Sequence, residues 1–396
     1  MNIISRLELA VESHPAKPAF IFFSSRKKWE TATFGQLADS TQRFASGLLA
    51  CGVTPGMTAA LMTPPSADFF ALAFALLKVG VIPIILDPAI GLKKVGKCLN
   101  ESKPDIFIGN GLTHTLRKLL GWGKDTIKHN LTIEKVKGRR SKVKDPITNY
   151  QSLFTTPAAI IYTSGSTGIP KGVLFTHENF AAQLDTLVET FNILPDEMDL
   201  PAFPLYALID ALLGVTSVIP DISFPVPGST NPQKVIEAIQ KFNVTNMFAS
   251  PVVLDILSKY GIQHGVKLPS LKRIITAGAP ATIQLQEDFR KLLNDETDLF
   301  GIYGATEVLP IAKVESREIF EVKNESAEGA GVCLGKPING AKVRIIGISE
   351  SAIERWQDSL EVKPNVVGEI TVQGGAVTES YIAREEANRL SKIHDG

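Results

Sequence analysis

The 396-residue sequence contains few cysteines and no excess of charge of either sign. Its three cysteines, Cys51, Cys98 and Cys333, are far apart and lack CxxC spacing, which argues against a disulfide framework and a cysteine zinc site. Lys plus Arg and Asp plus Glu number 41 each, so the chain has no overall positive field to hold nucleic acid or an anionic membrane. We therefore expect no nucleic acid partner and a reducing, cytoplasmic environment.

Long hydrophobic runs are also lacking. The longest, Phe69–Leu77, lies between Asp68 and Lys78 and is far shorter than the roughly 20 residues that a membrane-spanning helix needs. Charged residues interrupt the N-terminal region too early for the apolar segment of a signal peptide. We expect a buried helix at the apolar run and no integral membrane segment.

The overall composition is that of a globular protein. Hydrophobic residues make up 44% and charged residues 21%, which is ordinary for a protein with a packed core. At roughly 100–200 residues per domain, a chain of this length predicts two or three packed units.

Helical patterns alternate with short β-type runs in the first part of the chain. Helices are predicted for Phe34–Ala50, with Thr33 as N-cap, and from Ser66 to Gly80. The β-type runs between and after them are Ala59–Met62, Val81–Leu86 and Asp105–Ile108. Such alternation is typical of βαβ units and predicts a parallel sheet covered by helices.

The same alternation returns in the second half and predicts a second sheet layer. The predicted strands are Thr245–Ala249 and Arg273–Thr276, and the predicted helices are Pro232–Phe242, Val252–Tyr260 and Ile283–Leu293. Beyond Pro310 the runs Lys342–Ile346 and Glu369–Val372 are separated by Gly-rich turns, which favours a small, barrel-like β subdomain. We predict an α/β large domain over 1–378, with 1–200 and 201–310 mainly α/β and 311–378 the β subdomain, and a tail over 379–396.

A basic segment, Lys135–Lys144, has six Lys and Arg residues in ten. It could bind an anion, a carrier protein or nucleic acid. No aromatic residue interrupts the charges, so a solvated linker or edge strand is the favoured interpretation.

The most informative segment is a hydroxyl-rich and glycine-rich loop between two β-type runs. The run Ala158–Tyr162 precedes it and Val173–Phe175 follows it. The loop reads Thr163, Ser164, Gly165, Ser166, Thr167, Gly168, Ile169, Pro170, Lys171, Gly172. Backbone N–H groups, hydroxyls and one Lys in such a loop can converge on an anion, which predicts a polyphosphate site.

Two other interpretations of this loop are less favoured. A Walker loop needs Gly-Lys-Ser/Thr at a helix N-terminus, whereas here Pro170 precedes Lys171 and Gly172 follows it. A flexible linker would not be bracketed by apolar β-type runs.

With Thr163–Gly172 matched without a gap, the sequence resembles the adenylate-forming superfamily. This superfamily includes acyl-CoA synthetases, fatty acyl-AMP ligases, firefly luciferase and nonribosomal-peptide adenylation domains. Its Tyr-Gly-x-Thr-Glu motif appears here as Tyr303–Glu307. The resemblance implies ATP and Mg²⁺ as cofactors, adenine stacking on Tyr303, phosphate contact through Thr306 and Mg²⁺ binding through Glu307.

The resemblance also assigns roles to other segments. It implies that Lys171, Thr306 and Glu307 are the catalytic residues. Besides the loop Thr163–Gly168 and Lys171, the nucleotide would contact Gly278, Ala279, Pro280, Gly301, Ile302, Tyr303, Gly304, Ala305 and Thr306. The acyl group would contact Phe203, Tyr206, Ala207 and Ala277, with Ala207 standing where many members have His.

Two further residues affect this interpretation. Asp210 is a carboxylate within the otherwise apolar segment Phe203–Leu213, and it keeps an amino acid substrate open as an alternative. His177 opens the segment after the loop, as in many relatives, and we expect a structural role for it.

The implied function is that of a ligase of fatty acid metabolism. It would activate a fatty or 3-hydroxy fatty acid as acyl-AMP, release pyrophosphate, and pass the acyl group to CoA or an acyl-carrier protein or close it to a β-lactone. Phe203–Leu205 and Val218–Asp221 most resemble the enzymes of bacterial olefin biosynthesis that make β-lactones. The alternatives are a non-catalytic nucleotide-binding protein and an amino acid adenylation domain.

Members of the superfamily continue beyond an Asp-Gly like Asp395-Gly396. They carry a Thr-Gly-Asp segment, a hinge and a C-terminal lid of about a hundred residues with a catalytic Lys, in keeping with small-domain sizes. This sequence lacks those features. We therefore expect the 396-residue chain to be incomplete for full turnover.

Overall fold

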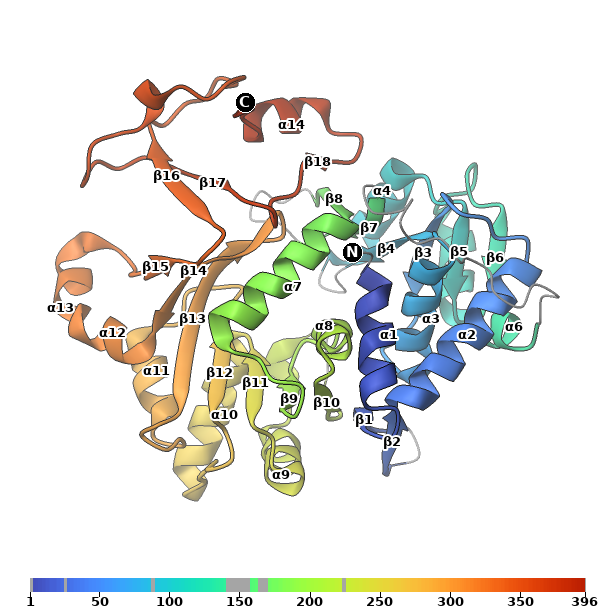
Figure 1. Cartoon of the computed structure of the whole chain (residues 1–396), viewed down its shortest axis with the longest axis horizontal. Coiled ribbons are helices and arrows are strands. Elements are labelled where there is room, and N and C mark those ends of the chain that lie inside the picture. The colour runs from blue at the N-terminus through green and yellow to red at the C-terminus, as the bar shows by residue number, and fades with distance from the viewer. Residues whose placement is uncertain are drawn as a thin grey trace.

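The computed structural model describes residues 3–24, 27–86, 90–139, 157–162, 170–222 and 226–395. Within these ranges, two large sheets are flanked by helices, and a two-stranded ladder lies near the C-terminal end (Figure 1). The predicted α/β fold class with layered sheets is confirmed.

The first sheet has seven strands in the order β18-β8-β7-β4-β3-β5-β6. Their bounds are β3 (Thr58–Met62), β4 (Ile82–Leu86), β5 (Ile106–Gly109), β6 (His129–Leu131), β7 (Pro157–Tyr162), β8 (Gly172–Thr176) and β18 (Ser380–Tyr381). β3 to β7 are parallel, whereas β8 is antiparallel to β7 and β18 is antiparallel to β8. The three runs predicted as strands before residue 110 are confirmed, with shifts of one residue at some ends.

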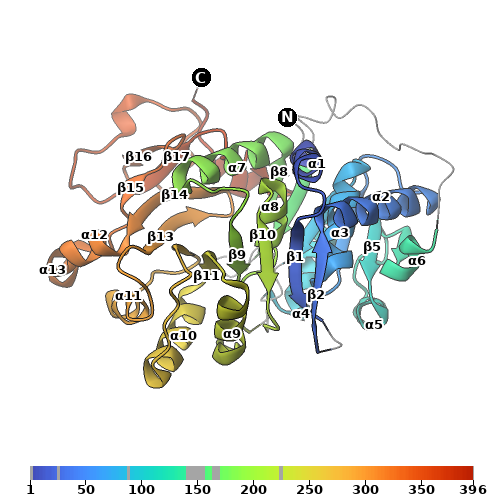
Figure 2. The same cartoon turned by 60° about the horizontal axis from the view of Figure 1, so that its bottom comes forward.

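The second sheet has nine strands in the order β15-β14-β13-β12-β11-β9-β10-β1-β2. Their bounds are β1 (Pro18–Phe23), β2 (Trp29–Thr33), β9 (Met198–Pro201), β10 (Thr216–Ile219), β11 (Asn246–Ala249), β12 (Arg273–Thr276), β13 (Asp298–Ala305), β14 (Val308–Glu315) and β15 (Lys336–Pro337). The strands from β1 to β13 in this order are parallel, and β2, β14 and β15 are antiparallel to their neighbours. β1 lies beside β10, although the two are far apart along the chain, and β2 forms the edge beyond β1 (Figure 2).

The longer helices cover the sheets. Those of the first half are α1 (Ile3–Ser13), α2 (Phe34–Ala50), α3 (Ala67–Lys78), α4 (Leu92–Ser102), α5 (Gly111–Leu120), α6 (Ile133–Lys137) and α7 (His177–Phe191). Those of the second half are α8 (Tyr206–Leu213), α9 (Pro232–Phe242), α10 (Pro251–His264), α11 (Ile283–Arg290), α12 (Ser316–Glu321), α13 (Lys323–Glu325) and α14 (Glu385–Ser391).

Local sequence explains where the predicted helices begin. The Thr33 hydroxyl accepts a hydrogen bond from the Gln36 amide, and the Gln36 side chain accepts one from the Thr33 amide, which makes a capping box at the start of α2. Ser66 caps α3 by accepting from the Phe69 amide. α3 is buried along most of its length, as expected of the longest apolar run.

Apolar side chains form two main cores. One packs α1, α2, α3 and α8 together between the two sheets, and Phe34, Phe44 and Phe74 are almost fully buried there. The other packs α9, α10 and α11 against the nine-stranded sheet, whose outer side they cover in Figure 1. The two sheets are thus joined through helices.

The C-terminal part differs from the prediction in two ways. β16 (Lys342–Ile346) and β17 (Glu369–Gln373) form an antiparallel two-stranded ladder, so the described residues show an open ladder in place of a barrel. The segment expected to be a tail is integrated into the fold, because Tyr381 is buried and β18 extends the seven-stranded sheet. The physical reason is that β8 has a free edge that can pair with a later strand.

The linker predicted over Lys135–Lys144 is wrong for its first residues. Lys135 and Lys137 belong to the short helix α6, and the Lys137 ammonium lies 2.9 Å from the Asp68 carboxylate. Residues 140–144 lie outside the described ranges. The ion pair and the buried Val136 tie α6 to the core, which the run of charges alone did not reveal.

Candidate active site

The predicted phosphate loop starts and ends on two neighbouring strands. Thr163–Ile169 lie outside the described residues, so the positions of Ser164, Gly165, Ser166, Thr167 and Gly168 stay a prediction. β7 and β8 are antiparallel with Tyr162 opposite Gly172. A Cβ atom on Gly172 would lie 2.6 Å from the Tyr162 ring, so only glycine allows this close pairing.

Lys171, just before β8, approaches the C-terminal segment. Its ammonium lies 4.9 Å from the centre of the Tyr381 ring, and the Lys392 ammonium lies 5.8 Å from the same ring. Two cations therefore face one aromatic side chain, a favourable cation–π arrangement. The predicted phosphate-binding residue Lys171 therefore lies near Tyr381 and Lys392, two residues that the sequence analysis did not predict to be part of the site.

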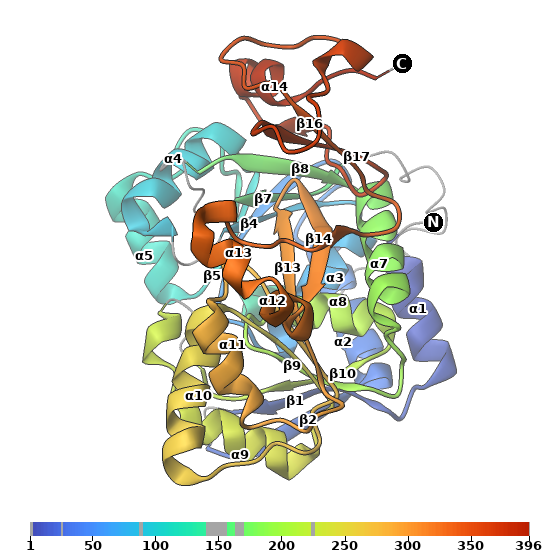
Figure 3. The same ribbon diagram turned by 90° about the vertical axis from the view of Figure 1, so that its left-hand side faces the viewer.

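The Tyr303–Glu307 motif forms the end of β13 and the turn into β14. Glu307 Oε1 accepts a hydrogen bond of 2.5 Å from the Tyr381 hydroxyl. The Glu307 carbonyl oxygen accepts hydrogen bonds from the amide and the hydroxyl of Thr378. β18, which carries Tyr381 and pairs with β8, therefore fixes the motif from a distant part of the sequence (Figure 1). Figure 3 shows β13 and β14 side by side, with β8 above them.

A groove of about 510 Å³ runs beside this motif. Tyr303, Ala305 and Glu307 line one side, and Arg344, Trp356 and Lys392 come from the C-terminal part. Burial lowers the pKa of the Lys392 ammonium, which donates a hydrogen bond to the Thr378 carbonyl. The groove has the size of a small-molecule site and combines an aromatic ring, a carboxylate and cations.

Glu307 fits the Mg²⁺ role that the family implies. Mg²⁺ is usually bound through one or two carboxylates together with phosphate oxygens and waters. Within the described part of the chain, no three His, Cys, Asp or Glu residues gather into a metal cage. Two carboxylates line the groove, and Asp395 is paired with Arg344 at 3.5 Å, so Glu307 is the one that a metal bound to a nucleotide would use.

The predicted adenine segment lies next to the Tyr303 motif. Ala277, Gly278, Ala279 and Pro280 follow β12 directly, and β12 is parallel to β13 with Thr276 opposite Gly301. Gly278 has φ +90°, a left-handed conformation that favours glycine. The structure thus brings the two predicted nucleotide segments together at the carboxyl ends of adjacent parallel strands, where ligands bind in such sheets.

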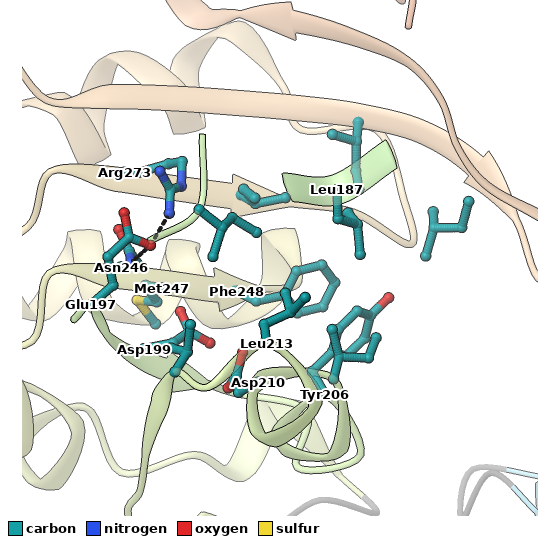
Figure 4. A pocket seen from close by; sticks show the side chains of 16 residues that line it. Leu187, Glu197, Asp199, Tyr206, Asp210, Leu213, Asn246, Met247, Phe248 and Arg273 are labelled. Atoms are coloured by element: carbon teal, nitrogen blue, oxygen red, sulfur yellow. Dashed lines mark hydrogen bonds and ion pairs between the residues drawn. The ribbon is translucent and has the colours of Figure 1, made fainter. Parts of the chain in front are cut away.

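A second cavity, of about 60 Å³, lies over the nine-stranded sheet (Figure 4). Tyr206 lines it and stacks on Phe248, with ring centres 3.8 Å apart. Ile302 and Leu309 bring the β13–β14 hairpin to its wall. Most of this lining is apolar, as an acyl pocket requires.

The other predicted acyl-contact residues are placed differently. Phe203 packs edge-on against Tyr206 with ring centres 6.0 Å apart. Ala207 is fully buried in the core of α1, α2 and α3, and among the described residues it does not line the cavity. Ala277 follows β12, also outside the cavity lining. Helical geometry explains the separation, because Tyr206 and Ala207 project about 100° apart on α8.

Sequence analysis missed a polar group at one end of this cavity. The residues are Glu197, Asp199, Asn246 and Arg273, and they join Asp210 from α8. The Arg273 guanidinium pairs with the Glu197 carboxylate, as the dashed line in Figure 4 shows. No sequence motif marks these residues. The only signal in the sequence is the alternation of side-chain directions along β9, β11 and β12, which places residues of neighbouring strands on the same face.

Asp199 and Asp210 form a buried carboxyl pair. Burial raises the pKa of Asp199 to about 7 and the pKa of Asp210 well above its usual range. The charge of Asp199 also raises the pKa of Asp210, and the Ser217 hydroxyl donates a hydrogen bond to Asp210 Oδ2 at 2.6 Å. The folded pair therefore holds a proton that two exposed carboxyl groups would have released.

Asp210→Asn is expected to flatten the pH dependence of stability. Because the pKa values of the pair are raised by folding, the folded protein keeps a proton that the unfolded chain releases above about pH 4. The stability from this pair is therefore present at low pH and lost as the pH rises through the folded pKa values. Between about pH 5 and pH 8, the free energy of unfolding of the wild type should fall by on the order of 1–2 kcal/mol more than that of the variant. Urea unfolding at each pH measures this free energy. An equal change with pH in the wild type and the variant would contradict a proton held by the folded pair.

His177 has the structural role that we expected. It begins α7, it is buried, and burial lowers its pKa to about 4. The side chain is therefore neutral at pH 7. The capping of α7 comes from Thr176, whose hydroxyl accepts from the Asn179 amide.

No helix in the described ranges is long and apolar enough to cross a membrane. This agrees with the expectation for the run in α3.

Comparisons with known proteins extend the family resemblance over most of the chain. The sequence profile of AMP-binding enzymes matches residues 7–382. An olefin beta-lactone synthetase of Stenotrophomonas maltophilia is 36% identical over 381 residues, covering 92% of this chain and 67% of that protein. One from Xanthomonas campestris pv. campestris is 35% identical, covering 92% and 66%. The chain spans about two thirds of the length of these relatives.

Solved structures support the fold. The o-succinylbenzoate coenzyme A synthetase of Bacillus subtilis, in complex with AMP, superimposes with a TM-score of 0.78 at 22% identity, covering 98% of this chain and 73% of that one. The N-terminal domain of FACL13 from Mycobacterium tuberculosis gives 0.79 at 20% identity, covering 98% and 92%. Together with the profile match and the two synthetases, the loop and the Tyr303–Glu307 motif show that this chain belongs to the AMP-binding enzyme family of the adenylate-forming superfamily.

Proposed function

We propose that this chain binds ATP·Mg²⁺ and an aliphatic carboxylic acid and forms the acyl-adenylate with release of pyrophosphate. One observation carries the proposal: the β13–β14 hairpin contributes to both cavities. Tyr303 and Glu307 line the groove, and Ile302 and Leu309 line the apolar cavity. A ligand with a nucleotide at one end and an aliphatic chain at the other is what such a shared wall would hold.

The residues would act by positioning and by neutralising charge. The acid carboxylate attacks the α-phosphorus and pyrophosphate leaves, so no protein nucleophile is needed. Lys171 and the hydroxyls of Ser164, Ser166 and Thr167 would hold the β- and γ-phosphates. Thr306 would contact the α-phosphate.

Glu307 would hold Mg²⁺, which, when bound, neutralises the phosphate charge that grows as pyrophosphate leaves. The described contacts support this role, because Tyr381 and Thr378 fix both the carboxylate and the backbone of Glu307. A ligand group held in this way loses little orientational freedom when it binds the ion.

We further propose that the acid carries a 3-hydroxyl group and that the adenylate closes to a β-lactone. In that step the 3-hydroxyl oxygen attacks the acyl carbonyl, AMP leaves with its phosphate oxygen, and the hydroxyl proton is released. Support comes from the two relatives named olefin beta-lactone synthetases. CoA and a carrier protein are the other acceptors, since feruloyl-CoA synthases are 26% identical to the chain.

We propose residues 1–378 as the nucleotide-binding unit, and β18, just beyond it, extends its seven-stranded sheet. The family profile reaches residue 382, and the Tyr381–Glu307 contact supports a functional role for this end. Adenylate formation and ligand binding can both be measured on the 396-residue chain.

Decanoic or 3-hydroxydecanoic acid is expected to drive ATP–pyrophosphate exchange, whereas phenylalanine is not. The physical reason is that the cavity walls near Tyr206 are apolar and that the Glu197 carboxylate, which could have bound an ammonium group, is already paired with Arg273. Exchange of labelled pyrophosphate into ATP measures the step, and mass spectrometry separates lactone, thioester and adenylate products. Exchange driven by the amino acid and by neither fatty acid would overturn the proposed substrate class.

A further inference from the structure

The polar end of the cavity beside Tyr206 lies at the opposite end of the strands from the nucleotide motif. Asp199, Asn246 and Arg273 stand side by side, because β9, β11 and β12 are parallel and in register at these positions. They are at the amino ends of the strands, whereas the Ala277 segment follows the carboxyl end of β12. The four residues of β12 separate the two ends by on the order of 13 Å, at about 3.3 Å per residue.

An acyl chain joined to AMP at the carboxyl ends would point its far end toward this polar group. Figure 4 shows the arrangement: Tyr206, Phe248 and Leu213 lie on one side, and the polar residues lie on the other. The cavity of about 60 Å³ has room for a small terminal group. For scale, a water molecule in the liquid occupies about 30 Å³.

One acceptor at this end has no partner. The Asn246 amide nitrogen donates to Glu197 Oε2 at 2.6 Å, but its Oδ1 atom is buried and accepts no hydrogen bond from any described residue. Asn246 is only 6% exposed and lines the cavity. A methyl group placed there would leave this oxygen unsatisfied, at a cost of about 1–3 kcal/mol.

We propose that this polar end is a specificity subsite for a hydroxyl group at the far end of the acyl chain. A hydroxyl can donate to Asn246 Oδ1 and at the same time accept a hydrogen bond from the protonated carboxyl of the Asp199–Asp210 pair. The Arg273 guanidinium is already paired with Glu197, so this end of the cavity offers no free cation to a negatively charged group of the ligand. The proposal rests on the proposed function, since it takes the cavity as the acyl site.

The test compares acids with equal numbers of non-hydrogen atoms, such as 9-hydroxynonanoic and decanoic acid, over a series of chain lengths. Calorimetry in the presence of ATP·Mg²⁺ gives the dissociation constants, and pyrophosphate exchange gives the turnover of each acid. At the length that reaches the subsite, the hydroxy acid should bind about 5–100-fold more tightly than its methyl partner, which corresponds to 1–3 kcal/mol. An ω-amino acid that binds better than the hydroxy acid would overturn the hydroxyl assignment.

Two variants test whether the preference for the hydroxy acid depends on Asn246. Asn246→Leu removes the acceptor with little change in volume and should bring the preference to within about twofold, since the partner of the hydroxyl is gone. Leu213→Ala, on the apolar wall, should weaken both acids and keep the preference. Thermal unfolding of each variant shows whether it is folded.

The outcomes separate the two proposals. If no carboxylic acid binds or drives exchange, the proposed function fails. If acids bind at every length with no preference for the hydroxyl, or if the preference persists in Asn246→Leu, the proposed function stands and the subsite is wrong.

Discussion

The Glu307→Gln variant of the full-length enzyme is expected to lose about 2–4 kcal/mol of transition-state stabilisation, or roughly 30- to 1,000-fold in adenylate formation. The amide keeps the shape of the side chain but removes the negative charge that a hard cation prefers. The contacts to the Tyr381 hydroxyl and to Thr378 hold Glu307 at the groove wall, so the effect should be electrostatic and not a loss of local structure.

The measurement is pyrophosphate exchange at a series of Mg²⁺ concentrations, together with calorimetry of ATP·Mg²⁺ binding to the 396-residue chain. Glu325→Gln is the matched control, because Glu325 is exposed on α13 and away from the groove lining. It should behave as wild type in both assays. If Glu307→Gln showed the same Mg²⁺ dependence as this control, the metal assignment would have to be given up.

Arg290→Gln is expected to destabilise the fold by about 3–5 kcal/mol, the range for breaking a buried ion pair by removing one partner. The Arg290 guanidinium bonds to the Glu315 carboxylate, the Ser316 hydroxyl and the Thr297 carbonyl. The two charged side chains are only 15% and 13% exposed. Without the Arg290 guanidinium, the poorly exposed Glu315 carboxylate keeps only the more distant Arg317 guanidinium, 3.5 Å away, as a cation partner among the described residues.

The neighbouring residue supplies the control. Lys291 pairs with Asp288 one turn away on the same face, and its side chain is 57% exposed. Lys291→Gln should therefore change stability by no more than about 0.5 kcal/mol, as for most exposed ion pairs. Urea unfolding of both variants measures the difference, and similar midpoints would show that the Arg290 network does not hold the hairpin.

This second effect also bears on function. β13 carries Tyr303, and the hairpin contributes to both proposed ligand cavities. A variant that loosens the hairpin should weaken ATP binding because it displaces Tyr303, and not because it removes a charge from the site. Arg290→Gln and Glu307→Gln are therefore expected to differ: the first lowers stability and affinity together, and the second lowers affinity and rate at nearly normal stability.

The sequence by itself determined the local elements and the family. Capping boxes, alternation and turn residues are local, so α2, α9 and β12 could be predicted with bounds that the structure reproduces. The spacing of the loop and of Tyr303–Glu307 is also local, and it predicted the superfamily that the profile match then showed. The roles of the individual site residues stay predictions, because the loop lies outside the described ranges and no ligand contact tests the rest.

Only the tertiary structure decided which distant segments meet. β1 pairs with β10, and Tyr381 reaches Glu307 across 74 positions of sequence. The polar end of the proposed acyl cavity likewise arises from the register of β9, β11 and β12, which brings Asp199, Asn246 and Arg273 into line. The physical reason is that strand pairing and burial depend on which edges and apolar faces remain to be covered once the whole chain has packed, and no local pattern of residues carries that information.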